Sequence, residues 1–312
     1  MTDPRPTRRR AIGLIALGGG LTLAALGSDA RSTVAPVRWR GAALGARAGL
    51  TVFHPDPVAA EKLIAIARAE LARLERIFSL YRADSALTRL NRDGVLAGPP
   101  LDLVELLARA QLWGARTGGA FDVTVQPLWR LYRDHFAQPG ADPAGPDGAA
   151  IARARALIDY GAMEVAAGRI RLARPGMAVT LNGIAQGDIS DRVADRLKAA
   201  GAAHVLVDLG EIVAIGGHPG GRPWRVGLAQ GGEIDLADRA VATSAANGFS
   251  FDQQGRLSHI LDPRTGRPAR GLRAASVVAR RAADADALST ALLVDKDLAT
   301  GDLPPDIDRI VL

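Results

Sequence analysis

Cysteine is absent from the sequence, which excludes disulfides, thiolate nucleophiles, cysteine metal centres and a lipid-modified N-terminal cysteine. None of the few lysines lies in a glycine-rich context, so a P-loop is excluded as well. The histidines are spaced too far apart for a His-x-x-x-His zinc motif. The glycine cluster at residues 216–221 lacks the spacing and the following helix of a dinucleotide fingerprint, and we interpret it as a turn between strands.

Long hydrophobic runs are also missing, and the longest modestly apolar run, residues 11–26, is interrupted by glycines. It is shorter than the roughly 20 residues that a membrane-spanning helix needs. Three arginines at 8–10 precede it and small residues follow it. This pattern predicts a cleaved twin-arginine-type signal over residues 1–30 and a periplasmic protein, with a retained membrane anchor as the alternative. Residues 31–312 are then the functional domain, long enough for two packed subdomains.

The positive charge is modest once the leader is set aside. The formal net charge is +6, and residues 1–30 contribute four Arg against two Asp, which leaves +4 for the remainder. The arginines are scattered among Ala and Asp and are not clustered with aromatic residues, so nucleic-acid binding is not expected. An apolar content of 48% is ordinary for a folded globular protein.

The order of the expected elements indicates an α+β fold with mixed sheets covered by helices. Asp56 and Pro57 are a good cap and first turn for a helix whose apolar residues then recur at helical spacing. Further helices are predicted at 102–116, 188–200 and 283–293. Strands are predicted at 50–54, 179–181, 204–207, 224–228, 241–243 and 275–279. The Pro/Gly-rich residues 138–148 are expected to form a surface insertion.

Two blocks in the first half combine aromatic and small residues. At residues 78–85, an aromatic pair follows the end of the first amphipathic helix, where such residues more often belong to the core. At residues 118–125, two glycines would let the backbone approach a ligand. Phe121 beside Asp122 then offers a ring face and an acceptor, while an ordinary glycine turn is the alternative.

A third block, residues 181–187, is a glycine-flanked loop at the start of a helix. Such a loop presents free N–H groups to an anion. An ordinary Asn/Gly turn before an amphipathic helix is equally compatible with the residues.

The fourth block contains two groups of polar residues near the C-terminus. Residues 258–266 carry His259 and Asp262 into a Pro/Gly turn, a place where scaffolds tend to position chemistry. Asp286 and Thr290 lie four residues apart in an Ala/Leu-rich run, so on a helix both would occupy one face and could converge on a hard cation. On an exposed helix they would be solvated or capping groups, but the apolar neighbours require a partner for the acid.

In this order, over roughly residues 38–295, the blocks resemble the FAD:protein FMN transferase (ApbE) family, and the resemblance implies an ApbE-like fold. It implies that Mg²⁺ is held by Asp286, Thr290 and the carbonyl of Gly183. It implies that His259 and Asp262 belong to the catalytic segment. The FAD contacts that it implies are Tyr81, Ala120, Phe121, Asp122, Thr180, Gln186 and Ile260.

The implied reaction is phosphoryl transfer, in which a threonine hydroxyl of a partner flavoprotein attacks FAD, FMN becomes a phosphoester and AMP leaves. Mg²⁺-dependent FAD hydrolysis and a non-enzymatic flavin-binding assembly role are the alternatives. Gln186 stands where relatives have Lys, and Thr180 stands where Asp is common. Together with the arginine leader, the Gln variant resembles the branch that serves nitrous oxide reduction, in which the acceptor is a membrane-bound electron-transfer protein.

Overall fold

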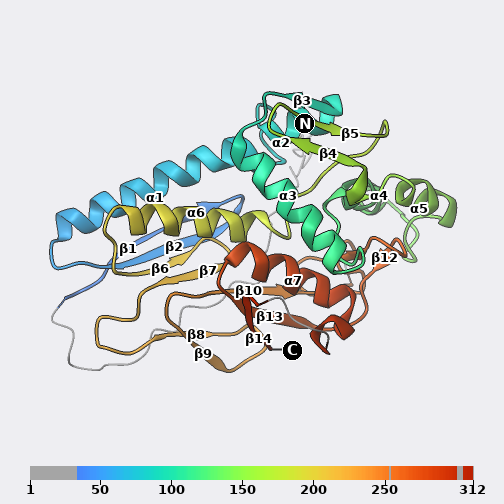
Figure 1. Ribbon diagram of the computed structural model, residues 1–312. Coiled ribbons are helices and arrows are strands. Elements are labelled where there is room, and N and C mark those ends of the chain that lie inside the picture. Colours follow the sequence, from blue (N-terminus) through green and yellow to red (C-terminus); the bar gives the residue numbers. More distant parts are fainter. Residues whose placement is uncertain (1–33, 253, 301–304, 312) are drawn as a thin grey trace, which may run out of the picture.

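The computed structural model describes residues 34–252, 254–300 and 305–311 (Figure 1). The predicted export signal over residues 1–30 lies outside these ranges. The described chain combines antiparallel sheets with helices, so the α+β prediction is confirmed.

A seven-stranded sheet forms the base of the molecule, in the order β1–β2–β6–β7–β10–β13–β14, and each neighbouring pair is antiparallel. Its strands are β1 (Val37–Ala43), β2 (Ala46–Phe53), β6 (His204–Asp208), β7 (Ile212–Ile215), β10 (Ala240–Ala245), β13 (Ala274–Ala279) and β14 (Ile307–Val311). Strands β2 and β6 are neighbours in the sheet although a long excursion of the chain separates them in sequence.

The two faces of this sheet are covered differently, because side chains alternate along each strand. Val205 and Val207 of β6 join the main core beneath helices α1 (Pro57–Phe78), α6 (Ala185–Ala199) and α7 (Ala282–Val294) (Figure 1). Leu206, between them, joins a second core. That core is closed by the hairpin of β8 (Trp224–Gly227) and β9 (Glu233–Leu236).

A helical lobe packs beside the α1 and α7 layer. It is built from α2 (Ala86–Asp93), α3 (Leu101–Arg116), α4 (Gln126–Phe136), α5 (Gly148–Arg155) and a small sheet in the order β3–β5–β4. The strands of that sheet are β3 (Val95–Ala97), β4 (Met163–Ala166) and β5 (Arg169–Leu172), and short 3-10 turns occur at η1 (Val123–Val125), η2 (Tyr160–Ala162) and η3 (Lys296–Thr300). Strands β11 (Leu261–Asp262) and β12 (Arg267–Pro268) form a small separate hairpin. Residues of the lobe and of the large sheet share one continuous apolar core.

Several local predictions are confirmed. The Asp56 side chain caps α1 by accepting a hydrogen bond from Val58 N, and Pro57 occupies the first turn. The predicted second, third and fourth helices correspond to α3, α6 and α7, and the glycine cluster at 216–221 connects β7 to β8. Residues 138–147 form the connection between α4 and α5. Among the described residues, none of the helices is both long and apolar enough to span a bilayer.

The predicted strand at residues 179–181 is wrong. The segment is buried and apolar, but a side chain takes the place of a neighbouring strand. The Asn91 amide donates to Val179 O at 2.8 Å, and its oxygen accepts from Val179 N at 2.6 Å. Because Asn91 already satisfies both backbone groups of Val179, no ladder is needed there.

Candidate active site

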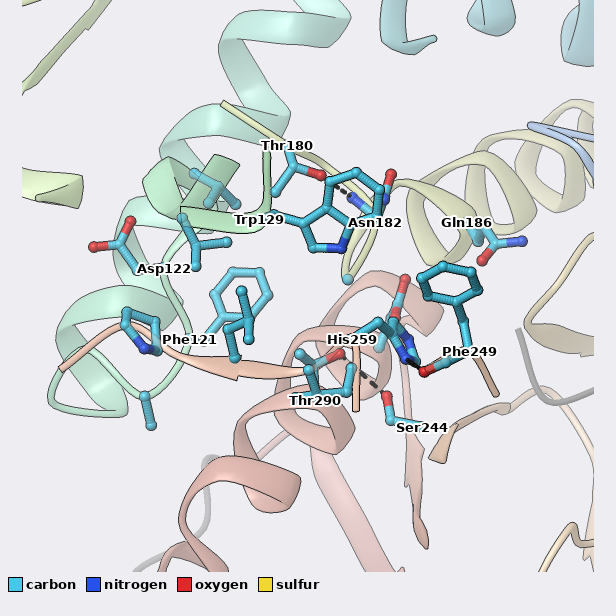
Figure 2. A pocket seen from close by; sticks show the side chains of 18 of the residues that line it. Phe121, Asp122, Trp129, Thr180, Asn182, Gln186, Ser244, Phe249, His259 and Thr290 are labelled. Carbon is cyan, nitrogen blue, oxygen red and sulfur yellow. Dashed lines mark hydrogen bonds between the residues drawn. The ribbon is translucent and has the colours of Figure 1, made fainter. Parts of the chain in front are cut away.

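A pocket opens where the helical lobe meets α6, α7 and the end of β10 (Figure 2). It encloses about 1100 Å³, including the part that is open to solvent. With the single exception of Asp262, every site residue predicted from the sequence lines this pocket: Tyr81, Ala120, Phe121, Asp122, Thr180, Gly183, Gln186, His259, Ile260, Asp286 and Thr290.

Asp286 is the most deeply buried of the predicted ligands. It lies in the second turn of α7, with 4% of its surface exposed, and its Oδ2 accepts a hydrogen bond of 3.1 Å from Gly187 N at the start of α6. Burial raises the pKa of Asp286 from 3.8 to about 7. The ionised form of such a buried acid is stabilised by a positively charged partner.

Glu211 is a second buried acid in the same pocket, and the sequence reasoning did not single it out. It lies in the turn between β6 and β7, is 4% exposed, and its Oε2 accepts from Thr243 N at 3.1 Å. Burial raises the pKa of Glu211 well above its usual value, and the charge of Asp286 raises it further. Across the described part of the chain, neither carboxylate takes part in an ion pair with Lys, Arg or His.

Hydroxyl groups from α7 and β10 meet in the same part of the fold. Thr290, one turn beyond Asp286 on α7, lies with its Oγ1 3.1 Å from Ser244 Oγ (Figure 2). The same Ser244 Oγ is 2.8 Å from Ser289 Oγ. The backbone at Gly183 passes close by, since a Cβ at this position would lie 2.9 Å from Thr290 Oγ1. The predicted metal-ligand residues Gly183, Asp286 and Thr290 are therefore brought together.

These residues fit a magnesium ion. Carboxylate, hydroxyl and carbonyl oxygens are the ligands that Mg²⁺ prefers, and a buried acidic pair without a basic partner gains from a cation. The described residues contain no group of three or more His, Cys, Asp or Glu side chains suited to a metal. A metal at this place would therefore use hydroxyl or backbone oxygens and water in addition to Asp286.

The start of α6 forms the wall that suits an anion. The helix begins at Ala185 without a side-chain cap from Ile184, and the positive end of its dipole lies at the pocket. Gln186 in its first turn is 6% exposed, and its Nε2 is buried without a hydrogen-bond partner. Gln186 packs against Gly210, where an added Cβ would lie 2.2 Å from Nε2 and would displace the amide, and where a φ of +110° strains any residue other than glycine. In the described chain, no Lys or Arg side chain lines the pocket.

Aromatic rings also line the pocket. Phe121 is buried and lies against Gly183, while Tyr81 is 54% exposed at the mouth. Trp129 and Phe249 also line the pocket (Figure 2), and the sequence analysis did not assign them a role. Trp129 follows the Phe121 block by only a few residues, and this proximity in sequence could have indicated that Trp129 lines the same pocket.

Asp122 and Thr180 are tied to the backbone around them. Asp122 Oδ1 accepts from the backbone and hydroxyl of Thr124, and Oδ2 accepts from Tyr160 N, so the side chain points away from the other labelled residues (Figure 2). Thr180 Oγ1 accepts from Asn182 N at 3.3 Å. The side chain of Asp122 thus fixes the loop that presents Phe121, and its oxygens are occupied within the protein.

His259 and Asp262, the two residues predicted to act in catalysis, have different positions. His259 lines the pocket with Nδ1 2.8 Å from Phe249 O, and because a carbonyl only accepts, Nδ1 carries the proton and Nε2 keeps its lone pair. Burial lowers the pKa of His259, which favours the neutral ring. Asp262 is turned toward the loop after β11, where its Oδ1 accepts from the backbone N and Nε of Arg264, and it does not line the pocket.

Comparison with known proteins gives a consistent result. The sequence profile of the ApbE family matches residues 44–300. A FAD:protein FMN transferase of Klebsiella pneumoniae is 30% identical over 271 residues, covering 81% of this chain and 77% of the relative. The apo crystal structure of the flavinyl transferase ApbE of Pseudomonas stutzeri is 31% identical, with a TM-score of 0.71 and 84% of both chains covered. An ApbE structure from Thermotoga maritima has a TM-score of 0.74 at 26% identity, over 85% of this chain and 90% of the other.

Proposed function

Because the chain belongs to the ApbE family, we propose that it transfers FMN from FAD to a threonine hydroxyl of a partner flavoprotein, with Mg²⁺ as its cofactor. The chain matches most of the length of relatives that are FAD:protein FMN transferases. It is an enzyme of this kind, which transfers FMN from FAD to a protein. The observation that carries the Mg²⁺ proposal is the buried pair Asp286 and Glu211, which lies beside the α6 N-terminus in a pocket that no Lys or Arg of the described residues lines.

The reaction breaks one bond and forms one. The Oγ of the acceptor threonine forms a bond to the FMN-side phosphorus of FAD, and the bond from that phosphorus to the bridging oxygen breaks. AMP leaves with the bridging oxygen, and the hydroxyl proton passes to a base. Such a reaction depends mainly on positioning and charge neutralisation, because little covalent assistance is needed.

Two walls of the pocket would bind the pyrophosphate of FAD. Asp286, Thr290 and the Gly183 carbonyl would hold Mg²⁺, which when bound supplies positive charge to the phosphate oxygens and the departing AMP. At the start of α6, where Ala185 N and Gly187 N are already bonded within the protein, the orphaned Nε2 of Gln186 would donate a hydrogen bond to the same anion. Phe121 and Trp129 would hold the flavin ring by stacking.

His259 is suited to receive the proton of the acceptor threonine. Its Nδ1–H is fixed by Phe249 O, so the ring can accept only at Nε2. Since burial lowers its pKa, the ring stays neutral and available as a base below the pH at which a free histidine would protonate. The Phe249 carbonyl orients the ring, and it would stabilise the positively charged ring that forms when Nε2 takes up the proton.

The acceptor has to reach the pocket from outside, and the exposed ring of Tyr81 marks the open side. We propose a periplasmic location and, from the resemblance of Gln186 and the arginine leader to the nitrous oxide branch, a membrane-bound electron-transfer protein as acceptor. The sequence motif at residues 8–10 supports the location.

The test is a product assay with purified protein, FAD, Mg²⁺ and candidate acceptor proteins. We expect a flavinylated acceptor and AMP in equal amounts, with the modified threonine located by peptide mass spectrometry. Free FMN and AMP in place of a modified acceptor would identify the enzyme as an FAD hydrolase. Unchanged FAD in the presence of an acceptor that a related transferase modifies would refute the proposal.

A further inference from the structure

Helices α6 and α7 lie side by side over the sheet, and each begins against the other (Figure 1). Asp286 of α7 accepts a hydrogen bond from Gly187 N in the first turn of α6. In return, Asp191 of α6 accepts from the first two amides of α7, with Oδ1 2.9 Å from Ala282 N and Oδ2 3.0 Å from Ala283 N. The two helices therefore cap each other reciprocally.

This arrangement allows little freedom. A Cβ at Gly187 would lie 2.4 Å from Ala282 O, so only glycine permits the two helix starts to approach this closely. Asp191 is 2% exposed and also forms an ion pair of 3.2 Å with Arg281. Two positive helix ends meet here, and the carboxylates of Asp191 and Asp286 are the groups that compensate them.

Asp191 lies outside the pocket, yet it holds the helix that carries Asp286 and Thr290. Without the two hydrogen bonds from α7, the first turn of that helix would lose its link to α6 and become free to shift. Asp286 is one turn further along, and its own bond to Gly187 depends on the same spacing between the helices. A shift of this kind would move the proposed metal ligands together relative to Gly183.

We infer that Asp191 is a positioning residue for the metal site, which it acts on by fixing the start of α7 against α6. The inference rests on the proposed function, because it takes Asp286 and Thr290 as the Mg²⁺ ligands. Groups that orient ligands in this way typically contribute about 10- to 100-fold to metal affinity. Asp191 touches neither substrate nor metal, so its effect should fall on metal affinity and not on the chemical step.

The experiment compares wild type with Asp191→Asn, which keeps the volume but offers one acceptor in place of two. Asp195→Asn is the matched control, because Asp195 also pairs with Arg281, at 2.8 Å, but is exposed and caps neither helix. The first measurement is the Mg²⁺ concentration that gives half the maximal FMN transfer. The second is hydrogen exchange at the Gly187 amide in protein without metal or FAD, relative to the Leu206 amide in β6.

For Asp191→Asn we expect about a tenfold rise in the Mg²⁺ concentration for half-maximal transfer, with the wild-type rate recovered at saturating Mg²⁺. We also expect faster exchange at Gly187 without a matching change at Leu206, and wild-type behaviour of Asp195→Asn in both measurements. If Asp191→Asn does not fold, Asp191→Glu, which keeps the charge but displaces the carboxylate, is measured in the same way.

Wild-type Mg²⁺ dependence in the variant would overturn the inference, even if its melting temperature falls. A reduced rate that saturating Mg²⁺ does not restore would overturn it as well. If wild type itself needs no Mg²⁺, the proposed function fails, and this outcome is distinct because exchange at Gly187 still reports whether Asp191 holds Asp286 in place.

Discussion

Replacing Asp286 by asparagine should separate the stability of the protein from its dependence on Mg²⁺. Asparagine has almost the same shape and keeps an oxygen that can accept from Gly187 N, so the bond between α7 and α6 is preserved. What it removes is the negative charge in a pocket where the acid is 4% exposed. The substitution therefore tests the charge and not the packing.

The magnitude follows from the pKa of Asp286, which burial raises from 3.8 to about 7. A difference of about 3 in pKa corresponds to about 4 kcal/mol between the protonated and ionised forms. Because the folded pKa lies above the unfolded one, the metal-free protein loses stability as the pH rises from about 4 to about 7, and the loss persists above this range. Asp286→Asn never ionises, so at about pH 8 and without metal it should melt up to about 10 °C above wild type.

Activity should change in the opposite direction. Mg²⁺ should raise the melting temperature of wild type at about pH 8 and leave that of Asp286→Asn unchanged, because the charged ligand is missing. FMN transfer at limiting Mg²⁺ should fall by about 10²- to 10³-fold, which corresponds to about 3–4 kcal/mol of lost charge stabilisation. The assay is a melting series over pH with and without Mg²⁺, beside the transfer rate. A folded Asp286→Asn protein with the wild-type rate at limiting Mg²⁺ would refute the metal assignment and most of the mechanism.

Four further predictions concern Gln186, His259 and the leader. Gln186→Lys should tighten FAD binding in calorimetry or leave it unchanged, because an ammonium is a stronger phosphate partner than an orphaned amide. A large loss of affinity would mean that the wall around Gly210 is built for Gln. His259→Asn keeps a donor for Phe249 O but removes the base, so kcat should fall by about 10²- to 10⁴-fold while FAD affinity is retained. Since burial lowers the pKa of His259, the wild-type rate at saturating Mg²⁺, which keeps Asp286 ionised, should persist below the pH at which free histidine protonates, and an acid limb at or above that pH would argue against this base. Replacing the three arginines at 8–10 with lysines should leave precursor inside the cell, and unchanged periplasmic accumulation would contradict twin-arginine export.

Local patterns in the sequence predicted much of the fold. The cap at Asp56 and the helical spacing after it gave α1, and the Ala/Leu-rich run gave α7 with two polar residues on one face. These predictions succeed because capping and period depend on residues a few positions apart. The strand prediction at residues 179–181 failed for the opposite reason, because the hydrogen-bond partner of Val179, the Asn91 side chain, lies far away in the sequence.

The site was predicted through its motifs, and the contacts between them became visible only in the fold. In the sequence, Glu211 is one acid among many that follow a predicted strand. Its place beside Asp286 depends on the antiparallel sheet, which brings the turn after β6 to the pocket. Phe249 likewise gains its role through the carbonyl that orients His259. Asp262, by contrast, is next to His259 in the motif but not in the pocket, because its short side chain accepts hydrogen bonds from Arg264 in the turn that follows β11.

The order of strands in the large sheet has a consequence for how the chain folds. Strand β2 ends at Phe53, and its neighbour β6 begins at His204, so α1, the helical lobe and α6 must all be formed or looped out before the two strands pair. Contacts of this sequence separation are slow to form, because loop closure precedes any gain from pairing. Flavin binding should therefore follow the synthesis of β6 and α7, and until β6 forms, β2 has an open edge on the side away from β1 that is prone to aggregation.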